Sequence, residues 1–248
     1  MNKFMVSKKI NKLIQLLFNK KYILGLFSGI AATTEHISLL KSVGPLNTII
    51  DIGANKGQFS LIATSIYPDA KIFSFEPLSK PADKFKSFFK NNNKVKLFKK
   101  AIGEKIENTN MYVSQRVDSS SLLKILDKQT EIFPGTQESN TEEVAVAPLS
   151  SFLSKVDLVR PVFLKIDVQG FELEVLIGSK DLIQNIDFIY VECSFVELYE
   201  NQALVNEIID FLKNQSFKFV GIYNMFYDKD GLAIQGDLLF KIGNDNET

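Results

Sequence analysis

The chain is poor in the residues that build covalent or metal-based frameworks. Its 248 residues include one cysteine, one histidine and no tryptophan. The single cysteine, Cys193, excludes an internal disulfide and is typical of a reducing compartment, so we expect a cytoplasmic protein. Cysteine and histidine together are too few for a zinc cluster. The aromatic content comes mainly from 21 phenylalanines, which predict a phenylalanine-rich core.

An excess of charge of either sign is also missing. The 29 lysines and arginines balance the 29 aspartates and glutamates. A nucleic-acid-binding protein usually carries a basic excess, so we expect no nucleic-acid partner. With 45% hydrophobic residues, the chain can bury the core of one sizeable domain, with or without an appendage.

Long uninterrupted apolar runs are absent. The best candidate for a membrane span, residues 10–30, contains Lys12, Lys20 and Lys21 and is too polar to cross a bilayer. It also lacks the apolar centre and cleavage pattern of a secretory signal. Its first half carries apolar residues at helical spacing, namely Ile10, Leu13, Ile14, Leu17 and Phe18. This pattern allows an interfacial membrane helix, but we favour a helix packed on the domain or on a second subunit.

Helical and strand patterns divide the chain near residue 45. Residues 8–43 are predicted to be helical, with a break at 25–29, and Gly44–Pro45 form a turn. Strands and helices then alternate at 47–52, 58–67, 71–75, 80–90 and 95–99. Further strands are expected at 162–166, 188–191, 217–223 and 236–242, with helices that begin at 172 and 203. The alternation predicts a parallel sheet, with a helical segment at 1–45 and a domain at 46–248.

The segment 103–146 departs from this alternation. Strands are expected at 109–113 and 144–147, with a long polar stretch between them. A long polar segment inside a compact domain is often functional or mobile. The pattern is equally compatible with a solvated insertion.

The stretch TIIDIGANKG, residues 48–57, indicates a ligand-binding loop. A β-branched strand ends at Asp51, and Gly53 and Gly57 bracket a short loop before a helix. The helix start offers free N–H groups. About twenty residues later, a second strand ends at Glu76, where a carboxylate can accept both hydroxyls of a ribose. The spacing favours a nucleoside-bearing cofactor over a plain strand–helix turn.

The loop does not fit the dinucleotide fingerprint. That fingerprint requires G-x-G-x-x-G, but Asn55 and Gln58 stand at the second and third glycine positions. The pattern D-x-G-x-x-x-G resembles instead the S-adenosylmethionine (SAM) loop of class I methyltransferases. An NAD- or nucleotide-sugar-binding oxidoreductase therefore stays an alternative that the missing glycines disfavour.

Acidic residues end four of the predicted strands, at Asp51, Glu76, Asp167 and Glu192. In an open parallel sheet, ligands bind outside the carboxyl ends of the strands. We therefore expect these four carboxylates to line one crevice.

Longer motifs make the resemblance more specific. The stretch VFLKIDVQGFELEVLIG (162–178), together with TIIDIGANKGQFS and FSFEP, resembles the FkbM-type family of SAM-dependent methyltransferases over about residues 35–242. DSSSL (118–122), FPGT (133–136), ECSF (192–195) and QGDLLF (235–240) resemble one branch of it. Residues 147–150, APLS, depart from the T-L-D expected there.

The resemblance implies a doubly wound, mostly parallel, seven-stranded class I methyltransferase (Rossmann-like) sheet with an N-terminal helical appendage. The final hairpin would supply an antiparallel strand. The implied activity is SAM-dependent O-methylation of a sugar, glycan or related small-molecule acceptor. By motif, the residues that would border SAM are Asp51, Gly53, Asn55, Gly57 and Gln58 around the methionine part, Glu76 at the ribose, and Ala101 and Ile102 at the adenine. Pro77, next to Glu76, would also belong to the cofactor site.

Methylation of a hydroxyl favours a general base, because the acceptor must lose its proton. Asp167 is the first candidate, with Glu192 beside it, and His36 is another because imidazole titrates near neutral pH. The two carboxylates could instead hold Mg²⁺, which the resemblance does not require, so we predict no metal site. A catalytically silent SAM-fold binding module is a further alternative. Oligomerisation is left open.

Overall fold

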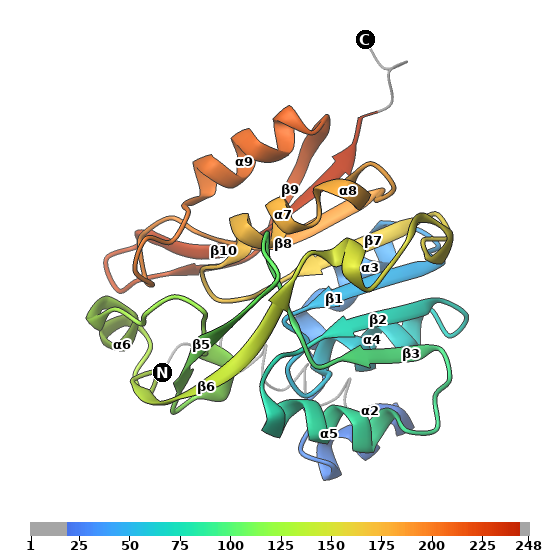
Figure 1. The fold of residues 1–248 in the computed structure, drawn as a ribbon, viewed down its shortest axis with the longest axis horizontal. Helices are drawn as coiled ribbons and strands as arrows, with labels where there is room; N and C mark the ends of the chain where they lie inside the picture. Colours follow the sequence, from blue (N-terminus) through green and yellow to red (C-terminus); the bar gives the residue numbers. More distant parts are fainter. Residues whose placement is uncertain (1–18, 244–248) are drawn as a thin grey trace.

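A computed structural model describes residues 19–243 of the chain. Its centre is a seven-stranded sheet in the order β3-β2-β1-β7-β8-β10-β9, in which all strands but β10 run parallel (Figure 1). The strands are β1 (Thr48–Ile52), β2 (Lys71–Phe75), β3 (Val95–Phe98), β7 (Val162–Ile166), β8 (Phe188–Ser194), β9 (Phe217–Tyr227) and β10 (Ala233–Ile242). This is the doubly wound class I methyltransferase topology predicted from the sequence, with the antiparallel strand in the last hairpin.

Helices cover both faces of this sheet. One face packs on α7 (Glu172–Gly178), α8 (Lys180–Ile183) and α9 (Val205–Asn214), in a core that includes Ile50, Leu164 and Val191. The other packs on α2 (Lys20–Phe27), α3 (Ile37–Ser42), α4 (Gln58–Ile66) and α5 (Ser79–Phe89). Alternate residues of β1, such as Ile49 and Ile50, enter the two cores, because successive side chains of a strand point to opposite faces.

The predicted polar segment 103–146 is an ordered part of the fold. β5 (Glu107–Ser114), β6 (Glu138–Ala147) and the short β4 (Ala101–Ile102) form a second, three-stranded sheet beside the first (Figure 1). The DSSSL and FPGT motifs bury polar side chains there, including Ser121 and Thr136. A freely solvated insertion is therefore the wrong interpretation of this segment. It also holds α6 (Asp127–Ile132) and the 3-10 helix η2 (Val117–Ser119).

The N-terminal helices of the described region pack on the sheet domain. Tyr22 of α2 and Leu39 and Leu40 of α3 are buried in the same core as Ile62 of α4. A 3-10 helix, η1 (Thr34–His36), leads into α3, and two others, η3 (Leu149–Ser151) and η4 (Lys155–Asp157), precede β7. The predicted amphipathic helix of residues 10–18 lies outside the described residues, and the boundary at residue 45 stays a prediction. Between residues 19 and 243, no helix combines the length and apolar character that a bilayer crossing requires.

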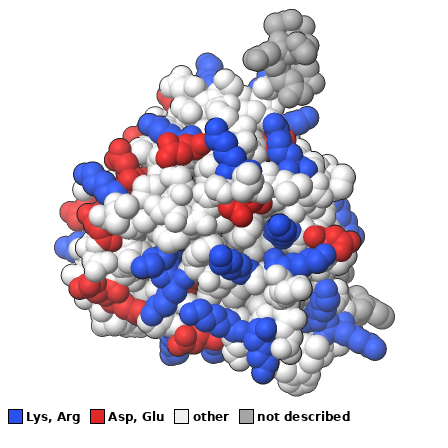
Figure 2. Space-filling model, turned by 45° about the vertical axis from the view of Figure 1, so that its right-hand side comes forward, with Lys and Arg blue, Asp and Glu red and all other residues white. Residues whose placement is uncertain are grey.

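Charges of both signs are interspersed on the face of the molecule that Figure 2 shows. This distribution agrees with the equal numbers of acidic and basic residues in the chain. Large fields of one sign attract ions and polyions of the opposite charge, and this face presents a mixed surface instead.

Candidate active site

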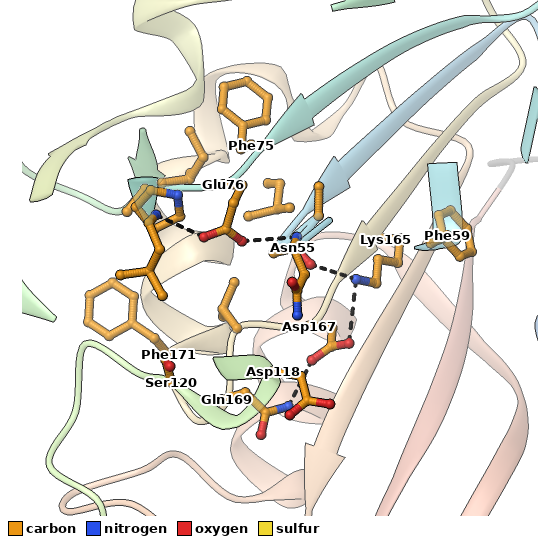
Figure 3. Close-up of a pocket in the computed structure, with 18 of the residues that line it drawn as sticks. Asn55, Phe59, Phe75, Glu76, Asp118, Ser120, Lys165, Asp167, Gln169 and Phe171 are labelled. Carbon is orange, nitrogen blue, oxygen red and sulfur yellow. Dashed lines mark hydrogen bonds and ion pairs between the residues drawn. The ribbon is translucent and has the colours of Figure 1, made fainter. Parts of the chain in front are cut away.

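A pocket opens at the carboxyl ends of β1, β2 and β7, with about 1020 Å³ of empty space, part of it open to solvent. Figure 3 shows Phe75, Glu76 and Phe171 at one end and Lys165, Asp167 and Gln169 at the other. The pocket therefore has a largely apolar end and a polar end.

The loop after β1 depends on a glycine that no other residue can replace without movement. Gly53 has φ +79°, and a Cβ there would lie 1.8 Å from the main-chain oxygen of Asp167. The N–H groups of Gly53 and Ala54 donate to Phe75 O, which ties the loop to β2. Asn55 is also left-handed, with φ 48°, a conformation that asparagine tolerates better than most residues. The loop is held tightly against the pocket.

Glu76 forms the bridge between the loop and β2. Its Oε2 accepts from the Asn55 N–H at 2.9 Å, and its Oε1 accepts from the Leu78 N–H at 2.8 Å. Burial raises the pKa of this carboxyl to about 7, although both N–H donors and Lys165 favour the charged form. Each oxygen keeps a lone pair for a further donor, so the group can accept a pair of hydroxyls.

Lys165 lies under the loop as a buried cation. Its Nζ is 3.3 Å from Asp51 Oδ1. It is also 3.4 Å from Asp167 Oδ2 and donates to Gly53 O at 3.2 Å (Figure 3). Burial alone would lower the pKa of Lys165, but the charges of Asp167 and Asp51 outweigh burial and raise it. The ammonium group thus joins β1, the loop and the end of β7.

An amide separates the two carboxylates that were predicted to act together. Gln169 Nε2 donates to Asp167 Oδ1 at 2.9 Å and to Glu192 Oε2 at 2.7 Å. Its Oε1 accepts from Tyr199 Oη at 2.9 Å, so every polar atom of the amide has a partner. These three bonds hold Gln169 in a left-handed conformation, φ 57°, that costs about 1–2 kcal/mol for a residue with a side chain.

His36 enters the pocket from the segment before β1. Its ring packs edge-on against Phe59 and Tyr190, and Nδ1 lies 3.0 Å from Tyr190 Oη. Burial lowers the pKa of His36, and Asp237 and Glu35 oppose that effect. The imidazole is therefore neutral at physiological pH and able to accept a proton.

The pocket brings together most of the residues that the sequence singled out. Nine of them line it, namely His36, Gly53, Asn55, Gln58, Glu76, Pro77, Ala101, Ile102 and Asp167. Their roles toward a ligand remain proposals.

Three of the predicted site residues do not line the pocket. Asp51 lies inside β1, fully buried, and accepts from Ser60 Oγ at 2.8 Å. Glu192 lies inside β8, which pairs with β10 beyond the predicted end at Val191. Gly57 faces α5, where a Cβ would lie 2.6 Å from a Phe89 ring carbon. The expectation that four acids line one crevice is therefore wrong for Asp51 and Glu192.

Sequence reasoning missed several lining residues. Lys165 interrupts an otherwise apolar strand, which was a signal of a buried charge, and Gln169 belongs to a motif that was noted only as a whole. Phe171 belongs to the same motif, whereas Met111 carried no local signal, because the three-dimensional fold alone brings it to the pocket.

The residues present fit SAM. Asn55 Oδ1 and Gln58 Oε1 are buried lining atoms that lack a hydrogen-bond partner within the described part of the chain, and such acceptors suit an ammonium group. Glu76 suits a ribose, and Ile102 and Phe171 give an apolar contact for a planar base. For a metal, residues 19–243 contain no cluster of three or more His, Cys, Asp or Glu side chains suited to holding an ion.

A family model identifies the family of the chain, and several known proteins are similar to it. Residues 51–219 match the family model of the methyltransferase FkbM domain. The chain is 26% identical over 220 residues to 2-O-methyltransferase NoeI of Sinorhizobium fredii, an alignment that covers 86% of each protein. It is 30% identical over 157 residues to Methyltransferase 1 of Beauveria bassiana, covering 56% of this chain and 62% of that protein. Precorrin-6y C5,15-methyltransferase of Geobacter metallireducens superposes with a TM-score of 0.44 at 12% identity, covering 80% and 81% of the two chains.

Proposed function

The chain belongs to the FkbM methyltransferase family, a family of SAM-dependent enzymes, and we propose that it methylates a hydroxyl of a sugar, a glycan or a related small molecule. The observation that carries the proposal is the two-ended pocket, in which a nucleoside-type end built around Glu76 adjoins a polar end built around Asp167 and His36. NoeI, the relative that aligns over most of both chains, is by its name an O-methyltransferase.

The chain's own residues would hold the methyl donor along the pocket. Glu76 would accept the ribose hydroxyls, with Pro77 beside it, and Ala101 and Ile102 would flank the adenine. Gly53, Asn55 and Gln58 would border the methionine part. Asp51 and Gly57 would act behind the loop, through Lys165 and α5, instead of touching the donor.

The polar end suits an acceptor rich in hydroxyl groups. Asp118, Gln169 and His36 offer hydrogen-bonding groups around the same space, from η2, the end of β7 and η1. A cofactor that carries an activated methyl group leaves the protein two tasks. These are to align the acceptor oxygen with that carbon and to remove the hydroxyl proton.

Three side chains are proposed for the proton step: Asp167, Glu192 and His36. Both oxygens of Asp167 already have partners, in Lys165 and Gln169. Glu192 accepts from Gln169 and from Gln235 Nε2 at 2.7 Å and does not line the pocket. His36 is therefore the strongest of the three candidates, and Asp167 is better suited to a fixed negative charge.

Membership in a methyltransferase family removes the reason to consider an NAD-dependent oxidoreductase. A catalytically silent SAM-binding module is still a distinct outcome. It would bind SAM without transferring its methyl group to any hydroxyl. The polar end of the pocket argues against it, because His36 and Asp167 place groups able to handle a proton beside the cavity, which binding alone does not require.

The test is a transfer assay with methyl-labelled SAM and a panel of methyl glycosides, analysed by mass spectrometry for methyl ethers. We expect O-methylation of at least one glycoside, and a large loss of activity in Glu76→Ala. Glycosides that carry an amino group are the control for the acceptor atom. Transfer to nitrogen, or SAM binding without any transfer, would contradict the proposal.

A further inference from the structure

We propose that Tyr190, Asp237 and Asn224 are positioning residues that hold His36 with its Nε2 free to take the acceptor proton. The catalytic part of this inference rests on the proposed function. The three residues lie behind the pocket on β8, β9 and β10, and none of them lines it. They would act on the acceptor only through the imidazole.

The four side chains form one hydrogen-bonded cluster. Tyr190 Oη donates to Asp237 Oδ2 at 2.7 Å and lies 3.0 Å from His36 Nδ1. Asn224 Nδ2 lies 2.8 Å from Asp237 Oδ2, 3.1 Å from Tyr190 Oη and 3.3 Å from His36 Nδ1. Asn224 adopts a left-handed conformation, φ 48°, within β9, at a point where the register of β9 and β10 is irregular. An irregular strand that redirects a polar side chain toward a neighbouring strand is typical of a functional position.

The direction of these bonds selects one tautomer. Because Tyr190 Oη donates its proton to Asp237, it can only accept a hydrogen bond from His36. The two amide protons of Asn224 are used by its shorter contacts, to Asp237 Oδ2 at 2.8 Å and Tyr190 Oη at 3.1 Å. The bond between Tyr190 and His36 then requires a proton on Nδ1, which leaves the lone pair of neutral imidazole on Nε2. Within residues 19–243, no hydrogen bond of the structure engages Nε2 of His36. The arrangement is a carboxylate–hydroxyl–imidazole relay, comparable in logic to the carboxylate that orients histidine in serine hydrolases.

Charges around His36 support proton acceptance. Burial lowers its pKa, so the free ring is neutral at pH 7. Asp237, Glu35 and Asp167 raise the pKa of the ring and Lys165 lowers it. Asp237 Oδ2 is 3.8 Å from Nδ1, close enough to stabilise the imidazolium once a proton arrives.

The proton and the methyl group move in a balanced step. The acceptor oxygen forms a bond to the methyl carbon while the carbon–sulfur bond breaks, and the electron pair of that bond stays on sulfur. The hydroxyl proton passes to Nε2, and the imidazolium later releases it to water. Asp237 stays a carboxylate throughout, and Tyr190 keeps its proton.

The first test is independent of any acceptor. Because His36 is the only histidine, its ring nitrogens are the only imidazole signals of ¹⁵N-histidine-labelled, tag-free protein. We expect the wild type at pH 8, with and without S-adenosylhomocysteine, to carry the proton on Nδ1. Tyr190→Phe and Asp237→Asn should move it toward Nε2. Tyr67→Phe, which removes a hydroxyl bonded to Leu40 O elsewhere, should not. A proton on Nε2 in the wild type would overturn the proposal.

The second test measures the pH dependence of turnover on the glycoside that reacts fastest. His36→Ala should lower kcat by about 10²-fold or more, the usual contribution of a general base. Asp237→Asn should lower kcat by roughly tenfold and shift the acid limb of kcat/KM to lower pH, because the charge that raises the pKa of His36 is gone. The KM for SAM should stay unchanged.

The two tests separate this inference from the proposed function. If Asp237→Asn does not fold, Asn224→Ala, at an exposed position, serves the same comparison and should lower kcat with SAM binding intact. An unmoved acid limb and wild-type kcat in these variants would refute the relay. If no glycoside is methylated, the proposed function fails, while the nitrogen spectra still decide whether the cluster sets the tautomer.

Discussion

The buried ammonium of Lys165 is the residue on which the polar end of the pocket depends. It neutralises Asp51, which has no exposed surface, and holds Asp167 and the Gly53 carbonyl in place. Removing one member of a buried ion pair leaves an uncompensated charge, which costs about 3–5 kcal/mol. The position of the loop after β1 is therefore set by the electrostatic contacts of Lys165 beneath it.

We predict that Lys165→Met lowers the free energy of unfolding by about 3 kcal/mol, measured by urea denaturation, because Asp51 loses its cation. Adding Asp51→Asn should recover part of that loss, so the two effects should not add. Lys94→Met is the matched control, since Lys94 pairs with the exposed Asp69 and such pairs contribute little. Equal losses at the two lysines would contradict this view of the site.

At the scale of the elements, β8 shows why part of the site could not be predicted. The apolar run of residues 188–191 ends at Glu192, which gave the predicted strand end. The strand continues to Ser194 because β10 pairs with it as far as Gln235. That pairing is a contact between distant segments, and local periodicity carries no information about it. By contrast, β2 and β7 have the predicted bounds, because each is bounded by local turn signals.

The loop between β1 and α4 should tolerate no side chain at Gly53. Gly53→Ala should lower the melting temperature and abolish SAM binding, because the new Cβ collides with Asp167 O. Gly231→Ala is the control, since Gly231 also has a positive φ, +84°, but open space around its Cβ position. Gly231→Ala should lose only about 1–2 kcal/mol of stability, the cost of placing a residue with a Cβ in a left-handed conformation. Calorimetric titration with SAM and thermal melting test both variants, and similar behaviour of the two would show that the steric contact with Asp167 O is unimportant.

For the whole molecule, buried carboxyl groups make stability depend on pH. Burial raises the pKa of Glu76 and of Glu172 to about 7, and raises the pKa values of Glu192 and Asp237 as well. A raised carboxyl pKa means that the folded protein binds more protons than the unfolded chain between about pH 4.5 and 7. Stability must then fall as the pH rises through this range. His36 acts in the opposite direction, since its pKa is lowered.

We predict that the melting temperature decreases from about pH 5 to pH 7.5. Glu172 alone should account for up to about 3 kcal/mol, from a pKa difference of roughly 2.5 units. Glu172→Gln should flatten the slope, because an amide does not titrate. The variant should still fold, because the amide oxygen can keep the bonds from the Val168 and Gly170 N–H groups. Glu200→Gln, at an exposed position, should leave the slope as it is. A melting temperature that rises over this range would contradict the assignment of buried, proton-binding carboxyl groups.

The central claim is that this pocket binds SAM through Glu76, and ligand-induced stabilisation measures it most directly. At a hundredfold excess over Kd, SAM should stabilise the wild type by about 2.7 kcal/mol, seen as a rise in melting temperature, and NAD should not. Glu76→Ala should lose the shift. Glu142→Ala should keep it, because Glu142 also accepts from a backbone N–H, that of Ser79, but does not line the pocket. A shift with NAD alone, or a SAM shift that survives in Glu76→Ala, would contradict the account.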